Sequence, residues 1–317
     1  MNIKNILVTG ASGKIGRHLV PVLVNYGYRV RAVEYNTPLE FEKVEIVKGK
    51  VEDEKFISKA LDGIDAVCHL ATCKEDRAHF IDVSIRGTFN LLDWSVKQKV
   101  KQFILAGGDA AIGIFYYPHP YPLDENSKLS AYPGYYAFSK AMEEFMCIQY
   151  QIQYNLPFTI LRFSWIHADD DILNHMCLNQ TFGGPSWKGL AKTPAQKEYF
   201  TKRKDGVGCL LHSDGKPFIR HIVGIDDVVQ AFILAINNKK AINQTFNIAA
   251  PSAFSYDIAA KYISEKLNLP VVKFICDEFY DFSIDITKAK SILGYNPQYD
   301  IFRIIDKAIE FRKSQNK

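Results

Sequence analysis

Short apolar runs alternate with longer amphipathic stretches through the first half of this chain of 317 residues. The runs are rich in Val, Ile and Phe, which favour strands. They lie at 6–8, 30–33, 44–47, 66–70, 103–106 and 158–161. Strands separated by helix-length segments form βαβ units, whose strands are parallel and whose helices cover both faces of the sheet. The pattern therefore predicts an α/β fold built on a doubly wound parallel sheet.

A glycine-rich loop follows the first apolar run directly. Gly10 permits a tight turn, Gly13 lets backbone N–H groups approach a pyrophosphate, and Gly16 lets the next helix pack against the strand. The N-terminus of that helix would add a partial positive charge. Glu34 ends the second run, where a dinucleotide fold places the carboxylate that binds ribose hydroxyls. Together these features predict dinucleotide binding on a Rossmann-type sheet, with a purely structural tight turn as the alternative.

The regular alternation ends after Arg162. Segment 167–216 is rich in Gly, Lys and aromatic residues, as is typical of a lid or substrate lobe. A βα-like segment at 219–236 and a strand at 245–248 are expected to return to the main sheet. We therefore expect two units: a dinucleotide-binding domain of residues 1–165 with 219–249, and a smaller C-terminal substrate lobe of residues 166–218 and 250–317.

Charge and cysteine content narrow the choice of partners and compartment. The 39 basic and 35 acidic residues give a net charge of +4, which is too small to argue for nucleic acid or membrane as a partner. Six scattered cysteines form no Cys-x-x-Cys pair, which favours reduced thiols over a disulfide framework and suggests no metal site. No signal-peptide pattern and no apolar run long enough to span a bilayer are present. The cytoplasm is the expected compartment.

Tyr136 and Lys140 place a phenol and an ammonium one turn apart on the same face of a helix that we expect to begin near Tyr136. A tyrosine with a pKa of about 10 is a poor base, but a neighbouring ammonium and a positive nicotinamide ring favour the phenolate. Tyr136 is therefore a candidate proton shuttle for alcohol oxidation. Tyr262 and Lys266 have the same spacing, but only Tyr136 follows a glycine-rich strand end at the distance that a dinucleotide fold requires.

The helix that carries Tyr136 is apolar around much of its circumference. One stripe contains Phe138 and Phe145, and a second contains Met142 and Met146. We expect one side to pack against the sheet and the other against a second copy of the chain, which predicts a homodimer. The alternative is a core helix within a monomer.

Further motifs accompany the loop and the Tyr–Lys pair. They are His69-Leu70-Ala71, Gly87-Thr88 with Asn90-Leu91-Leu92, Arg220 followed by Asp226-Asp227-Val228, and Asp285 with Leu293-Gly294-Tyr295 and Pro297. With these motifs the chain resembles, over nearly its whole length, the extended short-chain dehydrogenase/reductase family and within it the NAD-dependent sugar epimerase/dehydratase group.

The resemblance assigns roles to individual residues. It implies that Tyr136 is the acid/base, that Lys140 holds the nicotinamide ribose and lowers the tyrosine pKa, and that Glu34 binds the adenosine ribose. A carboxylate at Glu34 would repel a 2′-phosphate, so NAD is favoured over NADP as the cofactor. The residues expected to bind NAD are Gly10, Ser12, Gly13, Lys14, Ile15, Gly16, Glu34, Val51, Leu70, Ala71 and Lys140.

The sequence departs from the family pattern near the expected catalytic centre. Gly108 stands where the family usually has a Ser or Thr that polarises the substrate oxygen. Asp109 falls where sugar 4,6-dehydratases carry an acid, which makes it a candidate catalytic residue. The neighbouring base of those enzymes is replaced by Ala110, which argues against a 4,6-dehydratase.

Other departures concern the substrate and the adenine. Trp165 replaces an asparagine that contacts the phosphate of a nucleotide sugar, and Ala168 replaces the glycine after it, which together argue against a nucleotide-sugar substrate. Lys50 replaces a common adenine-binding aspartate and leaves backbone contacts near Val51. We take Gly108, Trp165 and Arg220 as candidate substrate-binding residues.

Three weaker signals have ordinary interpretations. His69 ends an apolar run and is expected to be a packed histidine rather than a catalytic one. His167, His175 and the aspartates at 169–171 could suggest a metal, but consecutive aspartates do not all face one point, so a polar loop is favoured. The basic residues of segment 188–204 favour a solvated surface, with an anion-attracting mouth as the alternative.

These observations lead to one main hypothesis, an NAD-dependent oxidoreductase or epimerase that acts on a hydroxyl of a small-molecule substrate, a sugar or sugar derivative. The alternative is a non-catalytic dinucleotide-binding sensor or scaffold, which the replacement of a hydroxyl residue by Gly108 supports and the Tyr136–Lys140 pair opposes. RNA binding is a third reading, for which the sequence offers no basic stripe.

Overall fold

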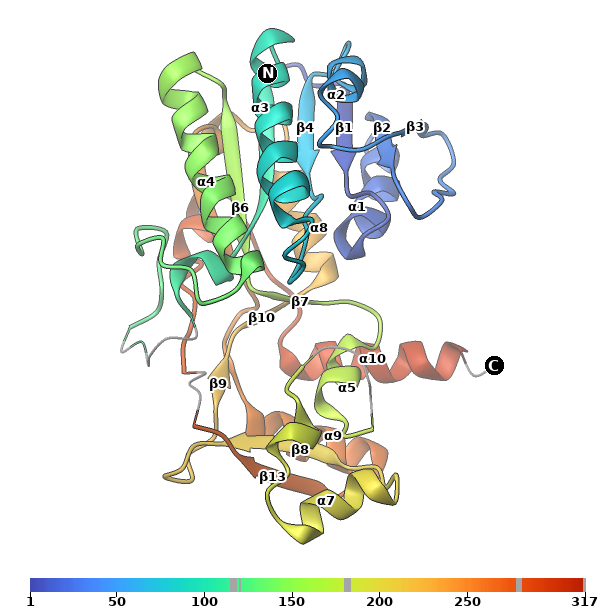
Figure 1. Cartoon of the computed structure of the whole chain (residues 1–317), viewed down its shortest axis with the longest axis vertical. Helices are drawn as coiled ribbons and strands as arrows, with labels where there is room; N and C mark the ends of the chain where they lie inside the picture. Colours follow the sequence, from blue (N-terminus) through green and yellow to red (C-terminus); the bar gives the residue numbers. More distant parts are fainter. Residues whose placement is uncertain (115–118, 120, 180–183, 278–280, 316–317) are drawn as a thin grey trace.

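The fold is described from a computed structural model, which describes residues 1–114, 119, 121–179, 184–277 and 281–315 (Figure 1). Its centre is a seven-stranded sheet in the order β11-β6-β5-β4-β1-β2-β3, and every neighbouring pair is parallel. The strands are β1 (Asn5–Thr9), β2 (Arg29–Glu34), β3 (Glu45–Lys48), β4 (Ala66–His69), β5 (Gln102–Gly108), β6 (Phe158–Phe163) and β11 (Gln244–Ile248). The predicted α/β fold with a Rossmann-type parallel sheet is confirmed.

The strand order reverses at β1. The chain runs outward through β2 and β3 on one side, then crosses back to β4 and continues through β5 and β6 on the other. In such sheets a crevice opens beyond the carboxyl ends of the two strands that flank the reversal. Thr9 at the end of β1 is paired with His69 at the end of β4, so these two strands end at the same level beside that crevice.

Helices cover both faces of the sheet. On one face, α1 (Lys14–Asn25) packs beside α8 (Ile225–Ala235); on the other lie α2 (Glu54–Ala60), α3 (Gly87–Lys97) and α4 (Tyr135–Tyr154), with α3 and α4 side by side in Figure 1. Alternating side chains of β1 pack against the helices on opposite faces of the sheet. Ile6 and Val8 belong to the core under α1 and α8, whereas Leu7 belongs to the core under α2, α3 and α4.

One sequence expectation about these helices is met. The helix expected near Tyr136 is α4, which begins one residue earlier. Asp53 caps α2, because its side chain accepts the backbone N–H groups of Lys55 and Phe56. Among the described helices, none has the length and apolar character needed to cross a membrane.

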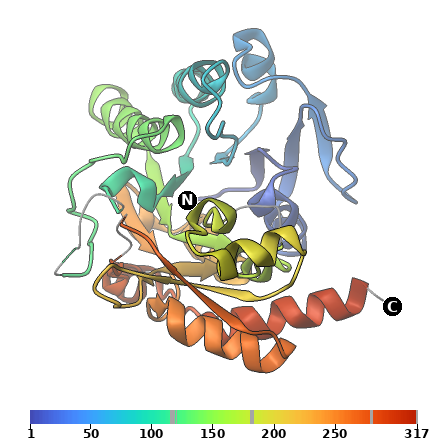
Figure 2. The ribbon, with the colours of Figure 1, turned by 60° about the horizontal axis from the view of Figure 1, so that its bottom comes forward.

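A smaller lobe lies beyond the carboxyl ends of the strands (Figures 1 and 2). Its core is separate from those of the sheet and packs around the parallel pair β8 and β13, with Phe274 and Tyr256 fully buried. Its elements are α5 (Asp171–Met176), α6 (Trp187–Leu190), α7 (Pro194–Thr201), β8 (Val207–Leu211), α9 (Tyr256–Leu267), β13 (Val271–Ile275) and α10 (Ile301–Gln315).

Short strands connect the two parts. β7 (Trp165–His167) pairs with β10 (Ile222–Gly224), and β9 (Ile219–Arg220) pairs with β12 (Phe254–Ser255). Of the segment expected to return to the main sheet, α8 and β11 do so, whereas β9 and β10 pair outside it. Single-turn elements complete the described chain: η1 (Ile81–Arg86), η2 (Asp109–Ile112), η3 (Lys239–Ala241) and η4 (Ala289–Leu293). The division of the chain at residues 165, 218 and 249 stays a prediction.

Candidate active site

A cleft of about 1190 Å³ opens at the carboxyl edge of the sheet and extends to the smaller lobe. Most of the residues proposed from the sequence line it: Gly10, Ser12, Gly13, Lys14, Ile15, Val51, Leu70, Ala71, Asp109, Tyr136, Lys140, Trp165 and Arg220. Gly16, Glu34 and Gly108 are not among the lining residues of the described chain. The fold therefore brings the expected nucleotide loop and the expected catalytic pair to one cavity.

The glycine loop is shaped by close backbone approaches. Gly10 has a φ of 64°, and a Cβ there would lie 2.6 Å from the backbone nitrogen of Ala71. A Cβ at Gly16 would lie 2.5 Å from Cα of Ala11. Gly13 starts α1, whose N-terminus has no side-chain cap and no acidic residue in its first turn. The N–H groups at this helix end fit a pyrophosphate, since both the unpaired donors and the helix dipole favour an anion.

Glu34 lies at the end of β2 and already has partners. Its Oε2 accepts the backbone N–H of Leu39 at 2.9 Å and its Oε1 lies 3.0 Å from Nζ of Lys48. The Leu39 hydrogen bond, followed by Lys48, lowers the pKa of this carboxyl. A carboxylate has about four acceptor sites, so ribose hydroxyls would still find room. The residues after it, 35–37, line the cleft and were not singled out from the sequence, although their position directly after Glu34 was a usable signal.

Tyr136 sits in the first turn of α4 and is held there from a distant part of the chain. The Glu75 carboxylate accepts the backbone N–H groups of Tyr135 at 2.8 Å and of Tyr136 at 3.4 Å. Gly134 has a φ of 151°, and a Cβ there would come within 2.8 Å of this carboxylate. Sequence reasoning missed Glu75, because nothing local marks a cap sixty residues from its helix.

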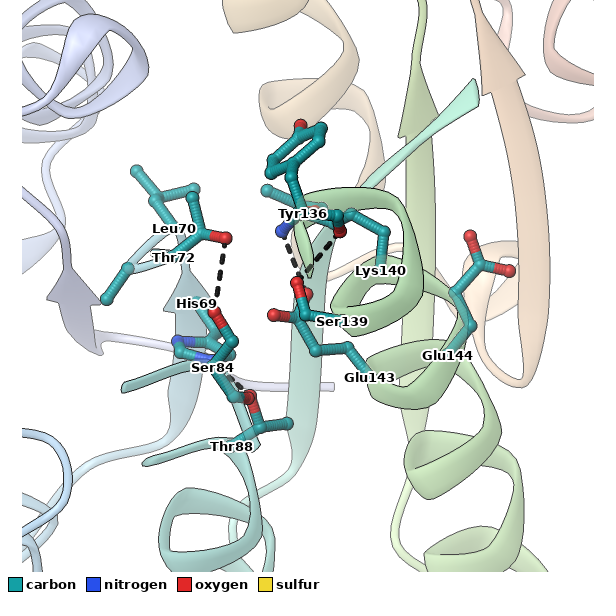
Figure 3. A network of polar contacts seen from close by, with 12 residues as sticks. His69, Leu70, Thr72, Ser84, Thr88, Tyr136, Ser139, Lys140, Glu143 and Glu144 are labelled. Atoms are coloured by element: carbon teal, nitrogen blue, oxygen red, sulfur yellow. Dashed lines mark hydrogen bonds and ion pairs between the residues drawn. The ribbon is translucent and has the colours of Figure 1, made fainter. Parts of the chain in front are cut away.

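Lys140 is buried one turn further along α4 (Figure 3). Its Nζ donates to the backbone oxygen of Ala106 at 3.0 Å and to Oε2 of Glu143 at 2.8 Å. The same Nζ lies 5.8 Å from the centre of the Tyr136 ring. An ammonium has three hydrogens, so one remains for a further acceptor in the cleft.

The pKa of Tyr136 differs from the sequence expectation. Burial raises it, and the nearby carboxyl groups of Asp109 and Glu143 raise it further. The expectation that Lys140 makes the phenol acidic is therefore wrong for the chain by itself. The physical reason is that burial disfavours a charged phenolate and that the two carboxyl groups place negative charge near it.

Asp109 enters the cleft from the turn that follows β5 and is almost fully buried. Burial raises its pKa to about 6, against the opposing effects of Arg220 and Ser164. Oγ of Ser164 lies 2.9 Å from Oδ2 of Asp109 and 2.8 Å from the carbonyl oxygen of His221. The Ser164 hydroxyl donates to Asp109 and so favours its charged form, whereas burial favours the neutral form.

Gly108 leaves space beside the phenol. A Cβ at this position would lie 3.5 Å from Oη of Tyr136 and 3.8 Å from Cγ of Lys140. A Ser or Thr here would thus place its hydroxyl next to the phenol, as the resemblance implies for other members of the family. Asp109, Ser164 and Tyr132 are among the polar residues that line the same cleft.

Trp165 and Arg220 form the far wall of the cleft. The guanidinium carbon of Arg220 lies 3.8 Å from the centre of a Trp165 ring, and the ring of His175 stacks on Trp165 at 4.3 Å. His167 packs edge-on against the same tryptophan. Burial lowers the pKa of His175 to about 4 and lowers that of His167 as well, so both rings are neutral. Trp165 is therefore held by stacking contacts and presents an aromatic surface to the cleft.

The metal reading of this region has no support in the geometry. Lys14 lies 2.6 Å from Oδ2 of Asp171, Arg17 binds Asp169, and Arg312 binds Asp170 at 2.8 Å. The three aspartates thus point to three different cations. Among the residues that the structure describes, no three His, Cys, Asp or Glu side chains gather to hold a metal ion.

His69 is a packed histidine, as expected. It is 1% exposed and its ring nitrogens contact the hydroxyls of Thr9 at 2.7 Å and Thr88 at 2.8 Å. Burial lowers its pKa to about 3. The Thr9 hydroxyl also accepts the N–H groups of Leu70 and Ala71, so this network fixes the strand ends that border the nucleotide loop.

Sequence and structure comparisons agree with the geometry of the cleft. Residues 6–171, just over half of the chain, match the model of the NAD dependent epimerase/dehydratase family, and the chain belongs to this family. The resemblance stated from the motifs is thereby confirmed. Members of the family bind NAD.

Individual relatives are distant but full-length. The chain is 25% identical to a putative UDP-glucose 4-epimerase of Methanocaldococcus jannaschii, over 98% of this chain and 99% of that protein. It is 25% identical to a UDP-N-acetyl-alpha-D-glucosaminuronate decarboxylase of Bacillus cytotoxicus, over 99% of each. Among solved structures, a short-chain dehydrogenase/reductase superfamily protein of Agrobacterium tumefaciens with bound NAD has a TM-score of 0.85 at 23% identity, over 98% of each chain. This last likeness concerns the fold.

Proposed function

We propose that this protein is an NAD-dependent oxidoreductase or epimerase that acts on a hydroxyl of a sugar or sugar derivative. The observation that carries the proposal is that Tyr136 and Lys140 line the same cleft as the glycine loop and lie at the carboxyl edge of the sheet. The names of the two full-length relatives, both of which refer to UDP-sugars, support a sugar as the substrate.

Each residue of the centre has a task that its geometry supports. NAD, when bound, supplies a nicotinamide ring that accepts a hydride from the substrate carbon and can return it. Oη of Tyr136 takes the proton of the substrate hydroxyl and gives it back in the reverse direction. Lys140, fixed by Ala106 and Glu143, offers its remaining hydrogen to a ribose hydroxyl of the cofactor. Glu75 keeps the first turn of α4, and with it Tyr136, in place.

In this proposal Asp109 replaces the Ser or Thr hydroxyl that other family members are expected to have at the position of Gly108. A neutral carboxylic acid beside Tyr136 can donate a hydrogen bond to the reacting oxygen of the substrate, which a Ser or Thr would otherwise do. Burial favours this neutral form, because it raises the pKa of Asp109 to about 6. The spacing of Gly108 from the phenol leaves room for the substrate oxygen to approach.

The substrate need not carry a nucleotide. Trp165, stacked between His175 and Arg220, occupies the position from which an asparagine would contact a nucleotide-sugar phosphate according to the resemblance. Arg220 places a cation among the residues that line the cleft. A panel of free sugars, sugar acids and UDP-sugars, each offered with NAD, identifies the substrate class by reduced nicotinamide and by product analysis, because an epimerase hides its transient NADH.

Substitution of Tyr136 tests the chemistry. Tyr136→Phe should abolish turnover while calorimetry still shows NAD binding, because the phenol oxygen moves the proton but the loop binds the nucleotide. Tyr262→Phe is the matched control: Tyr262 and Lys266 have the same spacing on α9, but this phenol binds Asp306 on the surface of the small lobe. Unchanged turnover in Tyr136→Phe would remove the phenol from its role.

The second candidate function is a dinucleotide-binding sensor or scaffold without turnover. The absence of a side chain at Gly108 is the observation that favours it. NAD binding without any change in the whole substrate panel would support this candidate over the enzyme.

We also propose that the protein forms a homodimer through α4. Phe138, Phe145 and Ile152 recur every seven residues along this helix and are 46%, 50% and 63% exposed, so one apolar face is uncovered in the single chain. The cytoplasm remains the proposed compartment, since all six cysteines are free thiols.

A further inference from the structure

Glu143 is a buried carboxyl that no sequence motif singled out and that the proposed chemistry uses only to hold Lys140. It lies in α4 three residues after Lys140, and its side chain is 0% exposed. Oε2 contacts Nζ of Lys140, whereas Oε1 has no hydrogen-bond partner among the described residues. A buried carboxylate oxygen without a partner is costly, so its presence beside the catalytic lysine calls for a reason.

The neighbouring carboxyl is engaged elsewhere. Glu144 holds Arg162 through two hydrogen bonds, of 3.1 Å to Oε1 and 2.8 Å to Oε2. Each of the two adjacent glutamates therefore has its own cation, and Figure 3 shows their side chains directed to different sides of α4. Glu143 is the described carboxylate that is paired with Lys140.

Other groups also face Lys140 and Tyr136. β5 presents the carbonyl oxygen of Ala106, and β4 presents His69, which is neutral. The turn after β5 presents Asp109, which has a pKa of about 6 and also raises the pKa of Tyr136. Glu75 reaches the backbone N–H of Tyr136 in the first turn of α4. Asp109 therefore adds negative charge near the phenol at neutral pH, but Glu143 is the described carboxyl that directly contacts the Lys140 ammonium.

We propose that Glu143 is a positioning residue: it fixes the Lys140 ammonium and offsets its charge, and it thereby raises the pH at which Tyr136 gives up its proton. This inference rests on the proposed function of Tyr136 as the acid/base. An opposite charge lowers the pKa of a neighbouring phenol only as far as it is uncompensated. A carboxylate in contact with the ammonium reduces that effect, so the protein keeps the phenol protonated until a positively charged ring or a higher pH favours the phenolate.

The charge can be removed while the contact is kept. Glu143→Gln retains an amide oxygen that accepts from Lys140 and removes only the negative charge. In Glu143→Gln we expect the acid limb of the pH profile of kcat, measured in the oxidation direction, to move to lower pH by about one unit. At a pH below the limb, kcat should therefore rise about tenfold. Glu143→Asp keeps the charge and should restore the limb towards its wild-type position. A limb that stays in place or moves to higher pH in Glu143→Gln overturns the proposal.

Glu144→Gln is the matched control. It removes a buried carboxyl at the next position of α4, but that carboxyl pairs with Arg162, so the melting temperature should fall while the limb keeps its position. If Glu144→Gln shifts the limb as far as Glu143→Gln does, a general loss of buried charge explains the effect and the specific proposal fails.

A second readout works without turnover. In protein labelled with ¹³Cζ-tyrosine, the resonance missing in Tyr136→Phe reports the titration of that phenol, and in Glu143→Gln its midpoint should fall to lower pH. If the midpoint shifts but the protein turns over no substrate, the proposed function is wrong while the effect of Glu143 on the phenol is supported. If turnover depends on Tyr136 but Glu143→Gln shifts neither the phenol midpoint nor the acid limb, the proposed role of Glu143 is wrong and the proposed function stands.

Discussion

The glycine loop allows folding and nucleotide binding to be tested separately. Gly16 lies inside α1, where an added Cβ would be 2.5 Å from both Cα and O of Ala11. Nonbonded heavy atoms prefer about 3.5–4.0 Å, so the overlap is about 1 Å, and it involves backbone that cannot rotate away. Overpacking costs about 1–3 kcal/mol, and Ala gains about 1 kcal/mol over Gly in a helix. Taking the upper end of the overpacking cost, Gly16→Ala should lower the free energy of unfolding by about 2 kcal/mol.

Gly13→Ala is the matched variant on the same loop. A Cβ there would meet only the carbonyl oxygen of Gly10, at 3.2 Å, and Gly13 has a φ of −75°, which alanine adopts without strain. We expect its free energy of unfolding to stay within about 1 kcal/mol of wild type. Its affinity for NAD should fall about tenfold or more, about 1.4 kcal/mol, because the methyl group occupies space needed by a pyrophosphate.

Urea unfolding followed by circular dichroism measures the first quantity, and isothermal calorimetry with NAD measures the second. The reasoning is refuted if Gly16→Ala is as stable as wild type. It is also refuted if Gly13→Ala binds NAD with unchanged affinity, since the loop would then not approach the pyrophosphate.

Two further predictions concern Asp109 and the exposed face of α4. Burial raises the pKa of Asp109 from 3.8 to about 6, so the folded chain binds more protons than the unfolded chain between these values. The free energy of unfolding should therefore fall by on the order of 3 kcal/mol as pH rises from about 4 to about 6. Asp109→Asn should flatten this part of the curve in urea unfolding at pH 4, 5, 6 and 7, and an equally steep curve would contradict the assignment. Phe145→Lys should convert the homodimer to a monomer in sedimentation velocity, whereas Ile258→Lys, at an equally exposed site on α9, should not; a wild-type monomer at micromolar concentration would end the dimer proposal.

The local sequence pattern predicted the sheet well because its signals are local. Strands such as β1 and β5 are short apolar runs bounded by glycine or polar residues, and their parallel pairing follows from the helix-length segments between them. The glycine loop was equally readable, since each glycine meets a backbone constraint within the same βα unit or the adjacent strand. Asp53 belongs to this class too, because a cap acts within two or three residues of itself.

The features that escaped the sequence depend on contacts between distant segments. Glu75 caps α4 from sixty positions earlier, and Ser164, the residue directly after β6, reaches Asp109 in the turn after β5. The pKa of Tyr136 was predicted in the wrong direction, because burial depth and the orientation of Glu143 are properties of the packed structure. β9 and β10 read as a return to the main sheet, but their neighbours are β12 and β7 in short pairs of their own.

The contacts of Lys14 and Arg17 have a consequence for the order of events in catalysis. Lys14 follows the glycine loop directly, yet it binds Asp171 and the carbonyl oxygen of Ile166, and Arg17 binds Asp169. The end of α1 that would receive the pyrophosphate is thus fastened to the segment that leads into the small lobe. A dinucleotide bound at this end would therefore stabilise the segment that borders the substrate side of the cleft. Such coupling favours compulsory-order kinetics, in which the dinucleotide enters first and leaves last.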